Sequence, residues 1–239
     1  MNVLIITGGS NGIGKAIAQK YFSEGYTVFS ISRSKVSGVA YQQLQTDLSN
    51  TQNAVNAIHS IFSNINSVSS ITLINNAGSL GEINTLGNLS PEKIQQTIKL
   101  NTTTPLVLTN AFIRLTKNLT CKKQIINISS GAAIKPYAGW SVYCSSKAAI
   151  DMITKTTALE QSELINGVKC IAIYPGVVDT NMQTAIRKTT EAEFKSVQRF
   201  RELKEKNELF STKFVANKIY HLAVSDILHN GTIIDVRKF

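Results

Sequence analysis

Short apolar runs alternate with longer amphipathic segments along most of the chain. Most of these apolar runs are rich in β-branched residues and predict strands at residues 3–6, 26–31, 70–75, 124–128, 168–174 and 232–236, and a further short strand is predicted at 41–45. The segments between them repeat apolar positions at helical spacing and predict helices at residues 12–24, 51–62, 90–118, 140–164 and 212–225. Ser90 followed by Pro91 is typical of a helix start, and Pro105 predicts an offset inside that helix.

Alternating strands and helices, with near-continuous apolar strands, are typical of a parallel sheet covered on both faces. Right-handed crossovers then give a doubly wound sheet. We therefore expect one Rossmann-type α/β domain over residues 1–239, with a mostly parallel seven-stranded sheet. The polar segment 180–210 is expected to form a lid, and most of its apolar residues (Met182, Ile186, Phe194, Val197 and Phe200) to pack rather than line a pocket.

Composition narrows the class of protein. The chain has 239 residues, of which 43% are hydrophobic and 17% charged, as in an ordinary globular protein. Its three cysteines are too few and too scattered for a disulfide framework or a metal site. We expect no leader, no membrane span and a cytoplasmic location. The net charge of +10 is spread without a basic block, so we expect no nucleic-acid partner, although it would attract a polyanionic cofactor.

A glycine-rich turn lies between the first predicted strand and helix. It starts at Thr7 and continues through Gly8, Gly9, Ser10, Asn11, Gly12, Ile13 and Gly14. Glycines there allow a tight turn and close approach of the backbone to a pyrophosphate, and the helix N-terminus offers free N–H groups. A purely structural turn is the alternative interpretation.

The end of the second strand bears on the choice of cofactor. A site for NAD usually has an acid there, but residues 27–38 contain none and include Ser32, Arg33 and Ser34. A guanidinium can pair with a 2′-phosphate through two parallel hydrogen bonds, which favours NADPH over NADH. The alternative is that Arg33 is a solvated loop residue.

Two further strand ends carry polar residues suited to the same cofactor. Asp47, followed by Leu48, could hold the adenine amino group or serve only as a turn or helix-cap residue. Asn75 and Asn76 could hold neighbouring strand ends together, and Ala77 and Gly78 would keep the backbone close to the cofactor.

Tyr143 and Lys147 lie four residues apart near the start of a predicted helix, so they share one face. A free phenol has a pKa of about 10, and a neighbouring ammonium favours its ionised form. Ser130 lies at the end of the preceding strand. By itself this spacing is a weak motif, because it occurs often by chance.

Taken together, the glycine turn, Asn75–Gly78, Asn101, Ser130, Tyr143/Lys147 and Pro175-Gly176 resemble the short-chain dehydrogenase/reductase family in type and order. The resemblance implies that Tyr143 gives a proton to the substrate oxygen, that Ser130 orients this oxygen, and that Lys147 binds the nicotinamide ribose. It implies that Asn101 holds a water next to Lys147. The nicotinamide would lie against Pro175, Gly176, Val178, Thr180 and Met182.

Within this family, residues near the predicted site are most similar to the branch of sepiapterin reductases and bacterial benzil reductases. That branch implies reduction of an aromatic 1,2-diketone in a pocket lined by Tyr137, Trp140 and Met182. Asp235 resembles an aspartate that anchors the pterin in sepiapterin reductases, although a surface aspartate at the sheet end is the other interpretation. A 3-oxoacyl thioester reductase and a non-catalytic NADP sensor remain alternatives. Family resemblance implies a homodimer or homotetramer formed through helices 91–118 and 140–165.

Overall fold

The computed structural model describes all 239 residues as one α/β domain built on a seven-stranded sheet. Every pair of neighbouring strands is parallel. The strands are β1 (Asn2–Thr7), β2 (Thr27–Ser32), β3 (Gln42–Gln45), β4 (Ser70–Asn75), β5 (Lys122–Ile128), β6 (Lys169–Tyr174) and β7 (Ile233–Asp235), in the order β3-β2-β1-β4-β5-β6-β7. The expected doubly wound fold is confirmed, and the sheet is parallel throughout.

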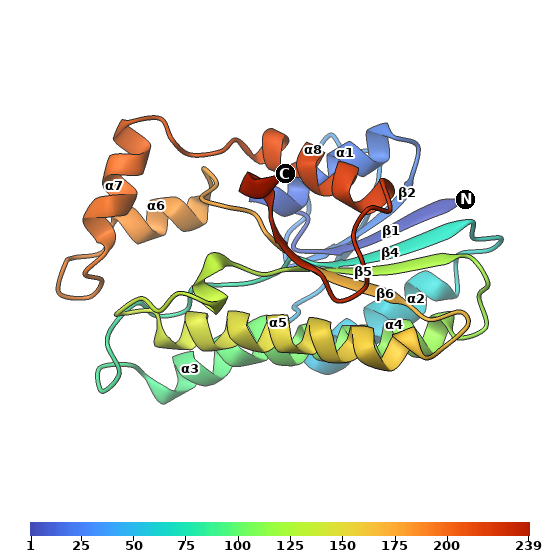
Figure 1. The fold of residues 1–239 in the computed structure, drawn as a ribbon, viewed down its shortest axis with the longest axis horizontal. Helices are drawn as coiled ribbons and strands as arrows, with labels where there is room; N and C mark the ends of the chain where they lie inside the picture. The colour runs from blue at the N-terminus through green and yellow to red at the C-terminus, as the bar shows by residue number, and fades with distance from the viewer.

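Helices cover both faces of the sheet (Figure 1). Helices α1 (Gly12–Ser23) and α8 (Thr212–Val224) pack on one face and enclose one apolar core with it. Helices α2 (Thr51–Phe62), α4 (Thr104–Thr116) and α5 (Ser141–Ser162) cover the other face around a second core. Strands buried between two cores explain the uninterrupted apolar runs in the sequence.

The helix expected at 90–118 is divided into α3 (Pro91–Ile98), a π-helical turn (Lys99–Thr103) and α4. Ser90 caps α3 by accepting a hydrogen bond from the backbone N–H of Lys93. The irregularity lies before Pro105 rather than at it. Proline has no N–H, so the carbonyl four residues earlier, that of Asn101, loses its α-helical partner and the preceding turn widens.

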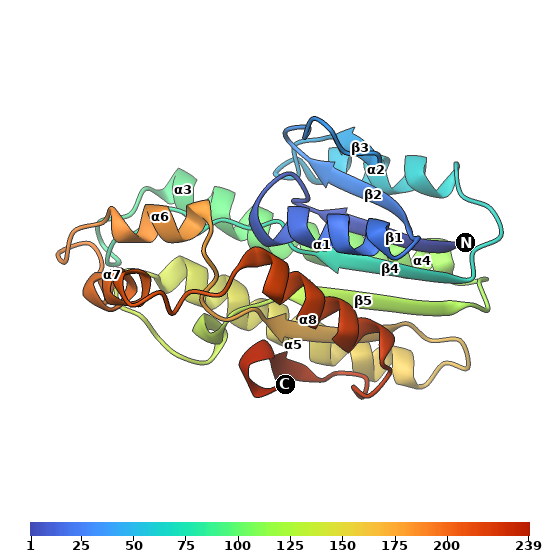
Figure 2. The same cartoon turned by 90° about the horizontal axis from the view of Figure 1, so that it is seen from above.

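Beyond the carboxyl ends of the strands, α6 (Asn181–Arg187) and α7 (Val197–Glu205) form a separate lobe (Figure 2). A third, smaller apolar cluster joins this lobe to the start of α5 and includes Trp140, Phe194, Val197 and Phe200. Phe194 and Val197 pack in this cluster as expected, but Met182, Ile186 and Phe200 also line a cavity, so the expectation that most of these residues pack rather than line a pocket is wrong. The helix expected from Trp140 begins one residue later, at Ser141.

No helix is long and apolar enough to cross a membrane. The three cysteines are free thiols.

Candidate active site

The glycine turn connects β1 to α1, and its glycines leave the backbone of the turn uncovered by side chains. Gly8 and Gly12 have φ values of +70° and +52°, a region that favours glycine. A Cβ on Gly9 would lie 2.3 Å from Ser30 Oγ, and one on Gly14 would lie 2.3 Å from the Gly8 carbonyl oxygen. Any side chain at Gly9 or Gly14 would displace its neighbours, so the local fold requires glycine there.

Polar side chains tie the strand ends next to this turn. Thr7 Oγ1 accepts hydrogen bonds from the backbone N–H groups of Asn76 and Ala77, both at 3.0 Å. Asn76 Nδ2 donates to the Thr7 carbonyl at 3.0 Å, and Asn75 Nδ2 donates to Asn127 Oδ1 on β5 at 2.9 Å. The predicted role of the paired asparagines in joining strand ends is consistent with these contacts.

A cleft of about 350 Å³, here called the glycine-turn cleft, runs across the carboxyl ends of the strands. Nearly all residues predicted to bind cofactor line it: Gly8, Ser10, Asn11, Gly12, Ile13, Gly14, Ser32, Arg33, Ser34, Asp47, Leu48, Asn76, Ala77, Gly78, Tyr143, Lys147, Pro175, Thr180 and Met182. Five other lining residues were not predicted, namely Ser49, Leu100, Ile128, Ser129 and Asn181. Gly176 and Val178 line a neighbouring cavity instead.

At one end of this cleft lies the exposed side chain of Arg33, which forms no ion pair. Nearby, Ser34 Oγ donates to Ser10 Oγ at 3.2 Å, which links the glycine turn to the loop after β2. Asp47 accepts hydrogen bonds from the Ser49 backbone N–H and hydroxyl, so it is a turn residue as well as a lining residue. A free guanidinium beside hydroxyl groups is suited to a phosphate.

At the other end of the cleft, Tyr143 and Lys147 lie buried on α5, where Lys147 Nζ donates to the Ile128 carbonyl at 2.8 Å. Burial raises the pKa of Tyr143 to about 12, although the neighbouring Ser130 hydroxyl lowers it. Burial lowers the pKa of Lys147 to about 8, and the negative charge of Asp151 opposes this shift. Near neutral pH the phenol is therefore protonated and the amine is mostly charged.

Asn101 lies in the π-helical turn, with its side chain buried. Its Oδ1 accepts from the Ser79 backbone N–H at 2.9 Å, and its Nδ2 donates to the Ser79 carbonyl and to Ser146 Oγ. A Cβ placed on Gly78 would lie 3.4 Å from Asn101 Oδ1 and 3.7 Å from Lys147 Nζ. The amide oxygen and the ammonium therefore border the same space beside Gly78.

A second cavity of about 350 Å³, here called the aromatic pocket, adjoins the first. Tyr137, Trp140 and Met182 line it, as predicted for substrate. The Trp140 ring stacks on Phe194 with centroids 4.4 Å apart, and Arg199 Nη1 donates to the Tyr137 hydroxyl at 2.9 Å. Ser130, predicted to orient the substrate oxygen, and Asp235, whose role was left open, also line it. Tyr174, Gln183 and Arg237 line it as well and were not predicted to do so.

Asp235 lies at the end of β7 with only 9% of its surface exposed, so the interpretation as a surface aspartate is wrong. It lines the aromatic pocket and forms an ion pair with Arg237, whose backbone N–H it also accepts at 3.0 Å. The hydrogen bonds from Arg237 hold the pKa of this carboxyl below its usual value. The ion pair with Arg237, two residues further along the chain, explains how the Asp235 carboxylate can be buried there.

No group of three or more His, Cys, Asp or Glu side chains is placed to hold a metal ion.

Comparison with known proteins defines the class. The family model described as short chain dehydrogenase matches residues 2–191. The chain is 40% identical over 243 residues to benzil reductase ((S)-benzoin forming) of Bacillus subtilis (strain 168), with all of both chains covered. It is 31% identical to sepiapterin reductase of Xenopus laevis, covering 61% of this chain and 54% of that protein. ElxO, solved with NADP bound, has a TM-score of 0.81 and 24% identity, covering 98% of this chain and 96% of ElxO.

The chain therefore belongs to the short-chain dehydrogenase/reductase family and is an oxidoreductase of that family. The predicted similarity to benzil and sepiapterin reductases is confirmed.

Proposed function

We propose that this chain is an NADPH-dependent carbonyl reductase that acts on small aromatic 1,2-dicarbonyl compounds such as benzil. The observation that carries the proposal is the position of Tyr143, which lines both the glycine-turn cleft and the aromatic pocket. A proton donor at this boundary can reach a carbonyl held in the pocket while the nucleotide occupies the cleft. Full-length similarity to a benzil reductase supports the substrate class.

The cleft fits a dinucleotide. Because the turn at Gly8–Gly14 has few side chains, a pyrophosphate can approach its backbone. The N-terminus of α1 lies beside it and offers free N–H groups. Arg33, with Ser32 and Ser34, would pair with a 2′-phosphate, which is the basis for NADPH over NADH. Lys147 would hold the nicotinamide ribose, and Pro175, Gly176, Val178, Thr180 and Met182 would contact the nicotinamide. When bound, this cofactor would supply the hydride that reduces the carbonyl carbon.

The protein's own part in the reaction is to bind the carbonyl oxygen and to protonate it. Tyr143 is protonated at neutral pH, since a phenol has a pKa of about 10 and burial raises that of Tyr143 further, so it can donate when negative charge develops on that oxygen. Ser130 donates a second hydrogen bond to the same oxygen and orients it. Charged Lys147 stabilises the phenolate left behind, and a water held by the free lone pair of Asn101 Oδ1 returns a proton from solvent.

The aromatic pocket fits an uncharged aromatic substrate. Its volume lies at the small end of the range usual for ligand sites, and aromatic rings from Tyr137, Trp140 and Phe200 line it. The segment 180–210 supplies Met182 to both cavities, so we propose that it serves as the lid that excludes water during reduction. The cofactor and a substrate carbonyl would meet beneath it.

The test is NADPH and NADH oxidation against benzil, 1-phenyl-1,2-propanedione, sepiapterin and an acetoacetyl thioester. We expect fast turnover of the diketones with NADPH. Tyr143→Phe should abolish turnover and leave NADPH affinity nearly unchanged, whereas Tyr220→Phe, far from both cavities, should behave like the parent. Preference for the thioester would favour the 3-oxoacyl reductase, and nucleotide binding without any turnover would favour the sensor. Parental activity in Tyr143→Phe would refute the assignment of the acid.

A further inference from the structure

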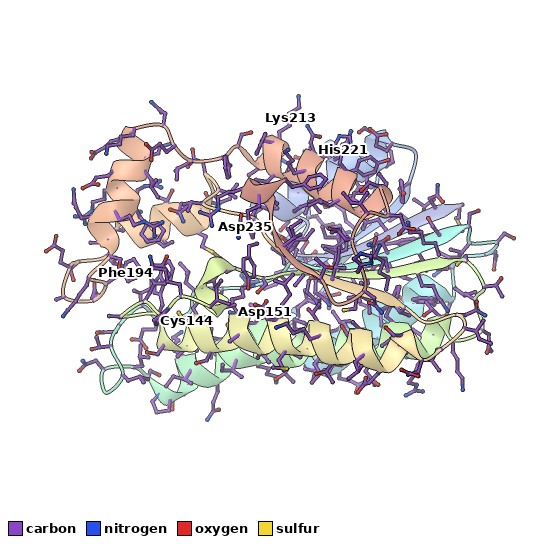
Figure 3. The ribbon with its side chains drawn as sticks, viewed as in Figure 1. Cys144, Asp151, Phe194, Lys213, His221 and Asp235 are labelled. Carbon is purple, nitrogen blue, oxygen red and sulfur yellow. The ribbon has the colours of Figure 1, made fainter.

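Asp151 is a buried carboxylate that has no role in the reaction proposed for Tyr143, Ser130 and Lys147. It lies on α5 one turn beyond Lys147, with 7% of its surface exposed. None of the five ion pairs of the structure includes it. In Figure 3 its side chain rises from α5 towards the sheet. Burying an unpaired carboxylate costs several kcal/mol, so its surroundings must stabilise the charge.

Two hydroxyl groups provide part of that stabilisation. Ser129 Oγ donates to Asp151 Oδ1 at 2.6 Å, and the Tyr174 hydroxyl donates to Asp151 Oδ2. Ser129 follows the end of β5 and Tyr174 is the last residue of β6. Each hydroxyl has one donor hydrogen, so both are oriented by the carboxylate.

These two contacts lie directly beside the proposed catalytic machinery. Ser129 precedes Ser130, and Tyr174 precedes Pro175 at the start of the nicotinamide loop. Ser129 Oγ also approaches the Lys147 carbonyl at 3.3 Å. One carboxylate thus connects the ends of two strands to the helix that carries Tyr143 and Lys147.

Asp151 also differs in charge from the other groups around Lys147. Lys147 Nζ donates to the Ile128 carbonyl on β5. It borders the space beside Gly78 together with Asn101 Oδ1. On its own helix it lies 5.8 Å from the centroid of the Tyr143 ring. These neighbours have no formal charge, whereas the carboxyl group of Asp151 lies one turn along the same helix. Burial is the larger influence on the pKa of Lys147, and the Asp151 charge acts against it.

We infer that Asp151 is a positioning residue for this reaction: it fixes Ser130 and the Pro175 loop through Ser129 and Tyr174, and it places a carboxylate one helical turn from Lys147. The inference rests on the proposed function. The two effects of Asp151 can be tested separately. The hydrogen bonds to Ser129 and Tyr174 depend on its acceptor oxygens, whereas its effect on Lys147 depends on its net charge.

The test compares Asp151→Asn with Tyr174→Phe in diketone reduction across pH. Above its pKa Lys147 is neutral, so parental kcat/KM should fall as the pH rises through about 8. Asp151→Asn removes the opposing charge, so this fall should move to lower pH and the rate at pH 9 should drop more than the rate at pH 7. Tyr174→Phe keeps the charge, so it should lower kcat at every pH without moving the profile.

Two controls make the result specific. Asp226→Asn removes a carboxylate that pairs with Lys122 and Lys169 at the opposite ends of β5 and β6, and its profile should match the parent. Asp151→Glu retains the charge and should retain the parental alkaline limb, even if its turnover is slower. If Asp151→Asn fails to fold, Asp151→Ser also removes the charge and takes its place in the comparison.

If kcat/KM of Asp151→Asn is lower at every pH but falls at the same alkaline pH as in the parent, the charge part of the inference is wrong. A shifted alkaline limb in Asp151→Glu would contradict it too. Full parental kcat in Tyr174→Phe would overturn the positioning part. Failure of the proposed function looks different, because the parent itself would then oxidise no NADPH with any carbonyl. In that case the pH dependence of NADPH binding, followed by nucleotide fluorescence, still compares Lys147 in the parent and in Asp151→Asn.

Discussion

Arg33→Asp tests the origin of cofactor preference. The Arg33 guanidinium is exposed at the edge of the glycine-turn cleft and forms no ion pair within the chain. It is therefore free to form two parallel hydrogen bonds with a 2′-phosphate. Aspartate at this position would repel that phosphate and could accept hydrogen bonds from the ribose hydroxyls of NADH.

The size of the effect follows from the exposure of the site. A hydrogen bond to a charged group contributes about 1.5–3 kcal/mol, and an exposed pair belongs at the low end of that range. Two such bonds give about 3 kcal/mol, which corresponds to about a 100-fold loss of NADPH affinity. Because the contact is exposed to solvent, the loss should shrink as the ionic strength increases.

The assay is the ratio of kcat/KM for NADPH over NADH with benzil, at low and high salt. We expect this ratio to fall about 100-fold in Arg33→Asp at low salt. Lys35→Asp is the matched control, since Lys35 is exposed on the same loop but does not line the cleft. An unchanged ratio in Arg33→Asp, or an equal loss in Lys35→Asp, would show that preference does not come from this guanidinium.

Three further perturbations test the glycine turn, the lid and the assembly. Gly9→Ala places a Cβ 2.3 Å from Ser30 Oγ, so it should cost about 1–3 kcal/mol of stability in a thermal melt, whereas Gly131→Ala, with open space around it, should cost little. Phe194→Ala removes a fully buried ring, and we expect a loss of about 3–5 kcal/mol in denaturant unfolding and a raised KM for benzil, with NADPH affinity unchanged. Leu159→Glu alters an apolar residue 70% exposed on α5 and should dissociate the expected homodimer or homotetramer in light scattering; a monomeric parent would contradict that expectation.

The glycine-turn cleft could be predicted from sequence because its determinants are local. A glycine turn between a strand and a helix, and residues four apart on one helix, specify their own geometry. Parallel strands then bring all the strand ends to one edge of the sheet, which places Arg33, Asp47 and Asn76 in one cleft. The π-helical turn was signalled by Pro105, but the missing N–H acts on the carbonyl four residues earlier, so the distortion precedes the proline.

The aromatic pocket could be predicted only in part, because it is assembled from segments far apart in sequence. Its walls come from residues near Ser130, the loop after β6, the α6–α7 lobe and the C-terminal Asp235 and Arg237. No periodicity links these segments, and an aspartate near a chain end resembles a solvated residue until its ion pair is seen. The residues expected to hold the cofactor and to move the proton thus lie on the sheet and α5, whereas the pocket wall depends on a lobe outside the sheet. Substrate choice can therefore vary through the lobe while the chemistry proposed for Tyr143 stays fixed.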